Sequence, residues 1–109
     1  MLESVMGKTV VFGQFEWDEE KSKSNIKKHG ISFEEATAAF EDPLFIQLYD
    51  AAHSAEGEER MKGIGVMKGL LVTATVFTER ARKRIISARK ADKKEEALYY
   101  ERNYGGKGD

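Results

Sequence analysis

The sequence contains no cysteine, a single proline and no hydrophobic run long enough to span a membrane. Without cysteine the chain can form neither disulfides nor thiolate metal sites, and it has no cysteine nucleophile. A membrane-spanning helix needs about 18 consecutive apolar residues. Residues 1–14 show neither the basic start nor the continuous apolar stretch of a secretion signal. We therefore expect a cytoplasmic protein that makes no contact with a membrane.

The chain also lacks a strong net charge, because 18 basic residues oppose 19 acidic ones. The charges are unevenly distributed, however. Residues 1–78 hold 8 basic and 13 acidic side chains, whereas residues 79–102 hold 9 basic and 5 acidic ones. A nearly neutral protein can still present one basic surface. We expect the later segment to contribute such a surface.

The apolar content is sufficient for one small domain. Leu, Ile, Val and Phe occur six times each in 109 residues, which is above the level typical of disordered chains. A length near 100 residues corresponds to a single domain. We expect one domain over residues 1–109, with a core of about 10–103 and a flexible glycine-rich tail at 104–109.

The local patterns predict an α+β fold with an antiparallel sheet, two N-terminal helices and a C-terminal helix. Strand patterns cover residues 10–15, 44–49, 58–67, 70–78 and 84–90. Helix patterns cover about 18–29, 32–42 and 92–103. Each helix has side chains that can cap its first turn: Asp18, Ser32 with Glu35, and Asp92 with Glu95. Because the strands alternate in polarity, we expect the helices to pack on one face of the sheet.

The expected turns fix which side chains share the other face. A two-residue turn at 68–69 pairs Met67 with Leu70, and we expect the next hairpin to pair Phe77 with Ile85. Gly63 and the glycine at 65 then lie on the covered face, where a helix can approach closely. On the outer face these registers gather one set of polar side chains: Arg60, Lys62, Thr75, Ser87 and Arg89.

Such a set can bind phosphate. Arginine binds phosphate oxygens through two parallel hydrogen bonds, lysine adds a compact charge, and hydroxyls donate to the same oxygens. The alternative is that these cations only solvate an exposed sheet and pair with glutamates. Among the other candidates, His29 fits a helix-capping role better than a catalytic one, and Tyr99 can pack, stack or transfer a proton. His53 belongs to no spaced ligand set, so we expect neither a metal site nor a cofactor.

Three blocks of the sequence carry a family resemblance. The runs FEWDEEKSKSNIKKHGISFEEA from Phe15, GEERMKGIG from Gly57 and TERARKRIISARKADKKEEALYYE from Thr78 resemble the BrnT toxins of bacterial type II toxin–antitoxin systems. The blocks occur in the same order and extend to Glu101. The resemblance implies a small RelE-like toxin fold and a metal-independent endoribonuclease that cleaves mRNA. It also implies a cognate BrnA-like ribbon-helix-helix antitoxin, with promoter DNA bound only through that antitoxin.

Positions in these blocks, together with the expected outer face of the sheet, suggest the site residues. Carried over from the resemblance, the expected catalytic residues are Arg60, Ser87, Arg89, Glu79 and His29. The expected RNA contacts are Lys62, Thr75, Thr78, Arg80 and Tyr99. In metal-free cleavage the ribose 2′-hydroxyl attacks the adjacent phosphate, so the enzyme must orient that oxygen and stabilise charge on phosphorus. The identity of the general base stays open among Glu79, Tyr99 and His29.

Two other functions remain possible from the sequence. A noncatalytic member of the same fold would bind RNA or the antitoxin without cleaving. A DNA-binding protein is the weaker alternative, because no helix-turn-helix motif or basic recognition helix is evident.

Overall fold

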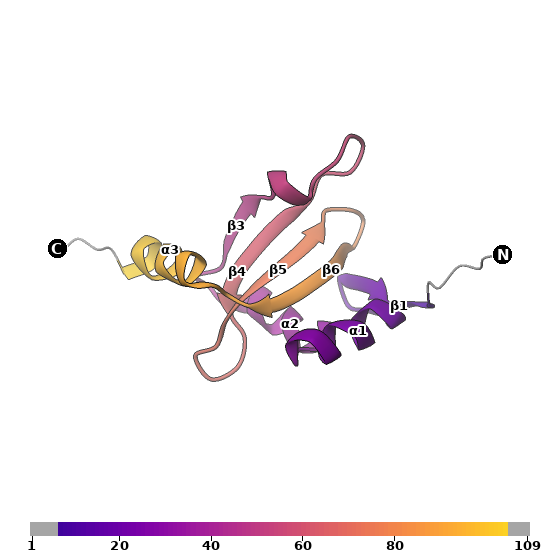
Figure 1. Ribbon diagram of the computed structural model, residues 1–109, viewed down its shortest axis with the longest axis horizontal. Coiled ribbons are helices and arrows are strands. Elements are labelled where there is room, and N and C mark those ends of the chain that lie inside the picture. Colours follow the sequence, from indigo (N-terminus) through magenta and orange to yellow (C-terminus); the bar gives the residue numbers. More distant parts are fainter. Residues whose placement is uncertain (1–6, 105–109) are drawn as a thin grey trace.

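The computed structural model describes residues 7–104 and places helices on both faces of a six-stranded sheet (Figure 1). The strands are β1 (Thr9–Phe12), β2 (Phe15–Asp18), β3 (Ile46–Tyr49), β4 (Met61–Val66), β5 (Val72–Thr78) and β6 (Lys83–Lys90), in the sheet order β1-β2-β6-β5-β4-β3. The helices are α1 (Glu19–His29), α2 (Phe33–Ala36) and α3 (Lys93–Tyr104), with short 3₁₀ turns η1 (Thr37–Glu41) and η2 (Ala51–His53). In this described part no helix has the length and apolarity needed to cross a membrane. Apart from residue 104, the predicted flexible tail lies outside the described residues.

The sheet is mixed, whereas the sequence predicted an antiparallel one. β2 runs parallel to β6, pairing Phe15 with Lys83, and the other neighbouring strands are antiparallel. The predicted strand at 10–15 is in fact a hairpin of β1 and β2. Its turn contains Gly13 with a φ of +61°, a conformation that glycine adopts without steric cost. This turn lets the chain reverse where a single strand was expected.

The two faces of the sheet are covered by different helices, which corrects the prediction that all helices pack on one face. On one face α2 packs into a cluster that includes Trp17, Phe33 and Ile85, with α1 against β6 and η1 against β4. On that face a Cβ added to Gly65 would lie 2.6 Å from the carbonyl oxygen of Ala39 in η1, so the predicted close approach of a helix is confirmed. On the opposite face α3 encloses a second cluster. Its buried members are Ile46, Ile64, Val72, Ala91 and Tyr99.

The β4–β5 register differs by one residue from the prediction. The loop contains three residues, 68–70, instead of two, because Leu70 takes a left-handed conformation with a φ of +70°. Lys62 therefore pairs with Val76, and Thr75 turns to the helix-covered face, where it is fully buried. A one-residue shift moves every side chain of a strand to the other face. The prediction that Thr75 lies beside Lys62 on the outer face is thus wrong.

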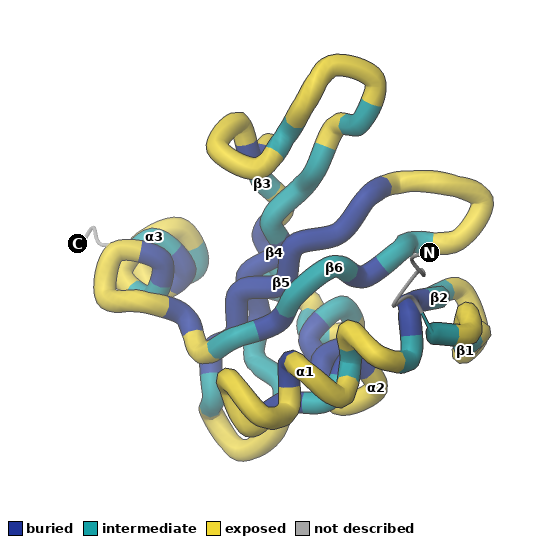
Figure 2. The backbone as a smooth tube through the Cα atoms, turned by 45° about the vertical axis from the view of Figure 1, so that its right-hand side comes forward, coloured by how far each residue is buried: buried dark blue, intermediate teal, exposed yellow. Residues whose placement is uncertain are grey.

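The β5–β6 hairpin pairs Phe77 with Ile85, as predicted. Directly beyond this pair, a β-bulge shifts the register, so that Val76 pairs with Ser87. A bulge inserts one extra residue into one strand and increases the local twist. Because Lys62 and Ser87 both pair with Val76, they lie in one row across β4, β5 and β6. β5 itself is buried along its whole length (Figure 2).

The predicted helix caps are all confirmed. The buried Asp18 carboxylate accepts a hydrogen bond from the Lys21 backbone at 3.0 Å. Burial by itself would raise the pKa of Asp18, but backbone hydrogen bonds led by that from Lys21 lower it. Each of the other two helices begins with a reciprocal capping box, formed by Ser32 with Glu35 and by Asp92 with Glu95.

Asn25 of α1 takes the place of a strand at the free edge of β6. β2 pairs only with residues 83 and 84 of β6, so this edge has no strand neighbour at Ala88. The buried Asn25 amide accepts from the Ala88 N–H at 3.1 Å and donates to the Ala88 and Ile31 carbonyls at 2.7 and 2.8 Å. Backbone groups buried without partners are costly. This side chain therefore fixes α1 against the sheet.

We predict that Asn25→Ala lowers the free energy of unfolding by about 2–4 kcal/mol, because the variant cannot form three buried hydrogen bonds and two backbone groups of Ala88 stay unpaired. Denaturant unfolding of the purified variant measures this change. Ser24→Ala, at an exposed neighbouring position of α1, is the control and should change stability by less than about 0.5 kcal/mol. Equal effects of the two substitutions would contradict the role of Asn25 in fixing α1 to β6.

Candidate active site

Two of the expected phosphate-binding cations are held by a carboxylate of α3. Arg89 donates to both oxygens of Glu95, at 2.7 and 2.9 Å, and Lys62 Nζ lies 2.8 Å from Glu95 Oε2. Glu95 is 7% exposed. Because a carboxylate presents two oxygens to a guanidinium much as phosphate does, Glu95 occupies the position that an anionic ligand would take. For Lys62 and Arg89, the structure therefore shows pairing with a glutamate.

The cluster also sets the charge state of Glu95. Burial alone would raise its pKa, but hydrogen bonds from Arg89 and Lys62, with the Asp92 backbone, lower the pKa from 4.5 to about 2. Hydrogen bonding to Glu95 in turn raises the pKa of Arg89. The carboxylate is ionised at neutral pH and links the first turn of α3 to β4 and β6.

We predict that this link weakens in acid. Because the pKa of Glu95 is lower in the folded chain than in the unfolded one, its contribution of up to about 3 kcal/mol is complete above pH 4.5 and is lost as the pH falls towards 2. Unfolding of the wild type and of Glu95→Gln should therefore differ most at pH 7 and converge near pH 2. A difference that does not change with pH would contradict the ionic role of Glu95.

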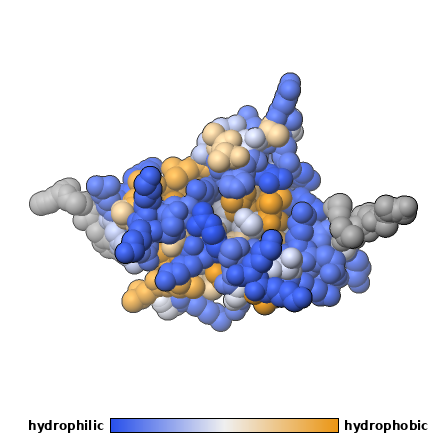
Figure 3. Space-filling model, viewed as in Figure 1, coloured by the Kyte–Doolittle hydropathy of each residue, from blue (hydrophilic) through white to orange (hydrophobic). Residues whose placement is uncertain are grey.

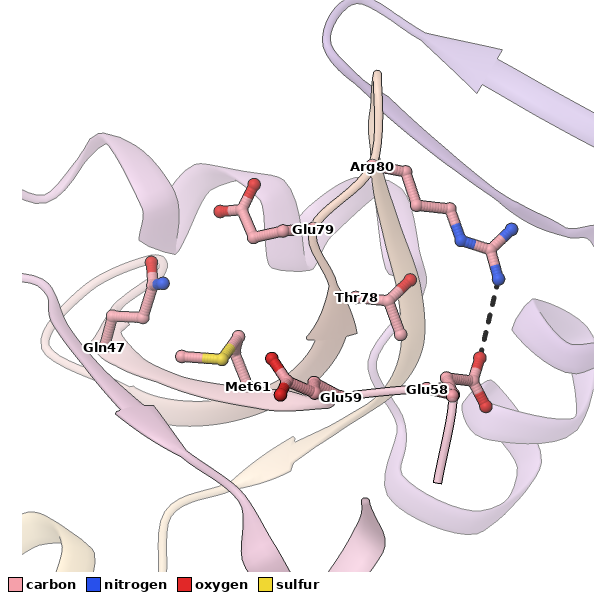
Figure 4. Close-up of a pocket in the computed structure, with 8 residues that line it drawn as sticks. Gln47, Glu58, Glu59, Met61, Thr78, Glu79 and Arg80 are labelled. Carbon is pink, nitrogen blue, oxygen red and sulfur yellow. Dashed lines mark hydrogen bonds and ion pairs between the residues drawn. The ribbon is translucent and has the colours of Figure 1, made fainter. Parts of the chain in front are cut away.

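A surface hollow lies away from the Glu95 cluster, where β5 leads into β6. It has a volume of about 670 Å³ and is open to solvent. We call it the Glu58 pocket, and Figure 4 shows its lining residues: Gln47, Gly57, Glu58, Glu59, Met61, Thr78, Glu79 and Arg80. Thr78, Glu79 and Arg80 are residues that the sequence placed in or beside the active surface.

Glu58 links this pocket to Arg60. Its carboxylate lies 3.2 Å from Nη2 of Arg60 and 3.5 Å from Nη2 of Arg80 (Figure 4 shows the second contact). The backbone of Arg60 is fixed on both sides, because its N–H donates to Ser54 Oγ at 2.8 Å and its carbonyl accepts from the Asp50 N–H at 2.8 Å. The two guanidinium groups therefore converge on one carboxylate at the pocket.

Two buried polar atoms beside the pocket have no hydrogen-bond partner among the described residues. They are Nε of Arg60 and Oγ1 of Thr78. Continuing the β4–β5 register by one residue sets Arg60 opposite Thr78. Buried polar groups nearly always have a partner, so each exception calls for an explanation. Because Nε of Arg60 and the hydroxyl of Thr78 can both donate a hydrogen bond, together they can bind an oxygen atom of a ligand.

The carboxylates of the pocket are balanced by cations in and around it. The carboxylates of Glu58, Glu59 and Glu79 are matched by Arg60, Arg80 and Lys83, the last of which lies 3.2 Å from Glu79. In the described part of the chain, Glu59 takes part in no ion pair. It is the pocket carboxylate available to accept a proton without first leaving a cation.

The remaining predicted residues lie elsewhere. His29 and Ser87 line a separate hollow between α1 and β6, so they do not join Arg60. Thr75 is fully buried. Tyr99 is 2% exposed, and its hydroxyl donates to Asp42, whose pKa is lowered although burial alone would raise it. Burial puts Thr75 and Tyr99 out of reach of an RNA strand, which corrects their expected role as RNA contacts.

Sequence reasoning missed Glu58 and Glu59. Both lie in the GEER block directly before Arg60, so the block itself was the available signal. Strand alternation gave no reason to choose them, because they precede β4 and belong to no regular pattern. In residues 7–104 no three or more His, Asp or Glu side chains are grouped so that they could hold a metal ion.

Comparisons with known proteins agree on one family. Residues 17–95 match the family model described as the ribonuclease toxin BrnT of type II toxin–antitoxin systems. Among solved structures, the chain is similar to the Brucella abortus ribonuclease toxin BrnT, with 31% identity and a TM-score of 0.55 over 71% of this chain and 94% of that one. No curated protein sequence gives a significant match. The matched residues include the whole Glu58 pocket and end at Glu95, in the first turn of α3.

Proposed function

Since the chain belongs to the BrnT family of ribonuclease toxins of type II toxin–antitoxin systems, we propose that it is an endoribonuclease that cleaves mRNA at the Glu58 pocket without a metal ion. Membership of the family implies an RNA target and an antitoxin partner. The observation that carries the site is the convergence of Arg60 and Arg80 on Glu58, beside the unpartnered atoms of Arg60 and Thr78.

The reaction begins with the ribose 2′-hydroxyl. Its oxygen forms a bond to the neighbouring phosphorus, its proton passes to a carboxylate, and the bond from phosphorus to the 5′-oxygen breaks. The 5′-oxygen takes a proton from solvent, which leaves a 2′,3′-cyclic phosphate and a 5′-hydroxyl. The enzyme lowers the barrier by holding the phosphate in place and by stabilising the extra negative charge.

Arg60 and Arg80 supply that stabilisation. A phosphate at the mouth of the pocket takes the place of the Glu58 carboxylate between the two guanidinium groups, since both anions accept paired hydrogen bonds from arginine. Nε of Arg60 and Oγ1 of Thr78 are buried in the free chain, so a phosphate oxygen reaches them only once Glu58 has been displaced. Glu58 holds both arginines in position before RNA binds.

Glu59 is the proposed general base. It lines the pocket, is exposed and has no ion pair among the described residues, whereas Glu79 is paired with Lys83. A base must come within hydrogen-bond reach of the proton that it removes. Lys62 stays a secondary RNA contact, and we propose the same role for Arg89, which the sequence suggested as catalytic, because RNA would first have to displace Glu95.

We predict that Arg60→Ala and Arg80→Ala each slow the cleavage of single-stranded RNA by about 10²–10³-fold, the usual effect of removing a preorganised donor to a developing charge. The rate is measured in EDTA with the chain purified free of its partner. Arg82→Ala is the matched control, because Arg82 is an exposed arginine of the same loop and its one described contact is to the Gly13 carbonyl at 3.4 Å. The control should cleave at the wild-type rate.

Other outcomes of this assay would overturn the proposal in different ways. Tight RNA binding by the wild type without cleavage would favour the noncatalytic module. Cleavage that disappears in EDTA would contradict metal independence. Equal reductions in Arg60→Ala and Arg82→Ala would move the site away from the Glu58 pocket.

The type of antitoxin, the location of the protein and the relationship of its fold are also proposals. We propose a BrnA-like ribbon-helix-helix antitoxin that alone contacts promoter DNA, a cytoplasmic location and a RelE-like relationship of the fold. Their support is the family resemblance of the three sequence blocks. A reading frame for a ribbon-helix-helix protein beside this one would support the antitoxin.

A further inference from the structure

The Glu58 pocket does not explain how the chain attracts RNA. Its three carboxylates balance its three nearby cations. Affinity for a nucleic-acid backbone comes mainly from cations that neutralise phosphates. Lys62 and Arg89 do not supply such charge while Glu95 holds them. A second, unbalanced cationic surface is therefore needed.

One smaller hollow has the required chemistry. It lies between α1 and β6 and has a volume of about 240 Å³. We call it the Lys28 hollow, and it is lined by Lys21, Ser24, Asn25, Lys28, His29, Ile86 and Ser87. No carboxylate belongs to this lining. Lys21, Lys28 and His29 form no ion pair within the described part of the chain.

The fold places the lysines there for a physical reason. Lys21, Asn25 and Lys28 are spaced four and three residues apart on α1, so they form one stripe of the helix. The amide of Asn25 is bound to the edge of β6 at Ala88. The lysines therefore lie one turn to each side of this anchor, next to Ser87. Hydrophilic residues cover α1 on the side seen in Figure 3.

We propose that the Lys28 hollow binds a phosphodiester of the RNA strand away from the linkage that is cleaved. Lys21 and Lys28 supply the charge, and the hydroxyls of Ser24 and Ser87 donate to the phosphate oxygens. This assignment rests on the proposed function for the identity of the polyanion as RNA. It gives Ser87 and Lys28 a role in binding, apart from the chemical step.

RNA suits this hollow better than an acidic protein does. Protein interfaces bury an apolar core, whereas Ile86 is the single apolar residue of this lining. The path between the two sites is also short. β6 starts after the loop that carries Glu79 and Arg80, and from Lys83 to Ser87 the strand advances about 13 Å. One RNA strand following β6 would thus contact both sites.

The test compares two double variants of α1 that remove the same charge. Lys21→Gln/Lys28→Gln changes the hollow, and Lys23→Gln/Lys27→Gln changes two exposed lysines of the same helix that lie outside its lining. Fluorescence anisotropy with a single-stranded RNA carrying 2′-deoxy substitutions, which cannot be cleaved, gives Kd at several salt concentrations. Circular dichroism checks that both variants are folded.

We expect the hollow variant to bind at least 10-fold more weakly at low salt. The slope of log K against log salt should become shallower by about 0.7 for each phosphate that the variant no longer neutralises. The control should stay within about 3-fold of the wild type, because each of its lysines contributes only to the general field. In cleavage assays the loss of binding should appear as a raised KM for RNA.

Two results would overturn the proposal. Equal weakening in both variants would show that α1 contributes only general charge, and unchanged binding in the hollow variant would exclude the site. If the hollow variant failed to bind antitoxin while keeping RNA binding, the surface would belong to the antitoxin. Failure of the wild type to cleave would count against the proposed function alone, since the binding assay does not depend on cleavage.

Discussion

Pairing between carboxylates and cations determines which basic side chains of this chain are available to an RNA phosphate. Lys62 and Arg89 both contact Glu95 at hydrogen-bond distance, and Glu95 is almost fully buried. Breaking such a cluster leaves charges without partners and is costly. Arg60 is held less tightly, at 3.2 Å from a partly exposed Glu58. The structure therefore favours the Glu58 pocket over the α3 side of the sheet as the place where a phosphate can enter.

In the mechanism that we propose, binding and chemistry are carried by different parts of the fold. The Glu58 pocket lies where β5 leads into β6 and is formed by residues from several strands and loops. The Lys28 hollow depends on α1, which Asn25 fixes to the free edge of β6. A pocket with balanced charge offers a phosphate little net attraction, while the unbalanced lysines provide attraction at longer range.

The helices and their caps could be predicted from sequence because the interacting residues lie three positions apart, as Asp92 and Glu95 do. The faces of the strands could be predicted only in part. A left-handed Leu70 lengthened the turn by one residue and moved Thr75 into the core. The contact of Lys62 with Glu95 spans 33 residues, and it requires α3 to cross to the face opposite α1. No local pattern in the sequence encodes that crossing.

The proposed mechanism depends on the scissile phosphate binding between Arg60, Thr78 and Arg80. NMR can follow the Nε–Hε resonances of the arginines while a non-cleavable 2′-deoxy analogue of the RNA is added. We predict that the Arg60 resonance shifts most, because its Nε gains a hydrogen-bond partner, while Arg89 stays on Glu95 and changes little. A large shift at Arg89 with none at Arg60 would contradict this placement of the phosphate.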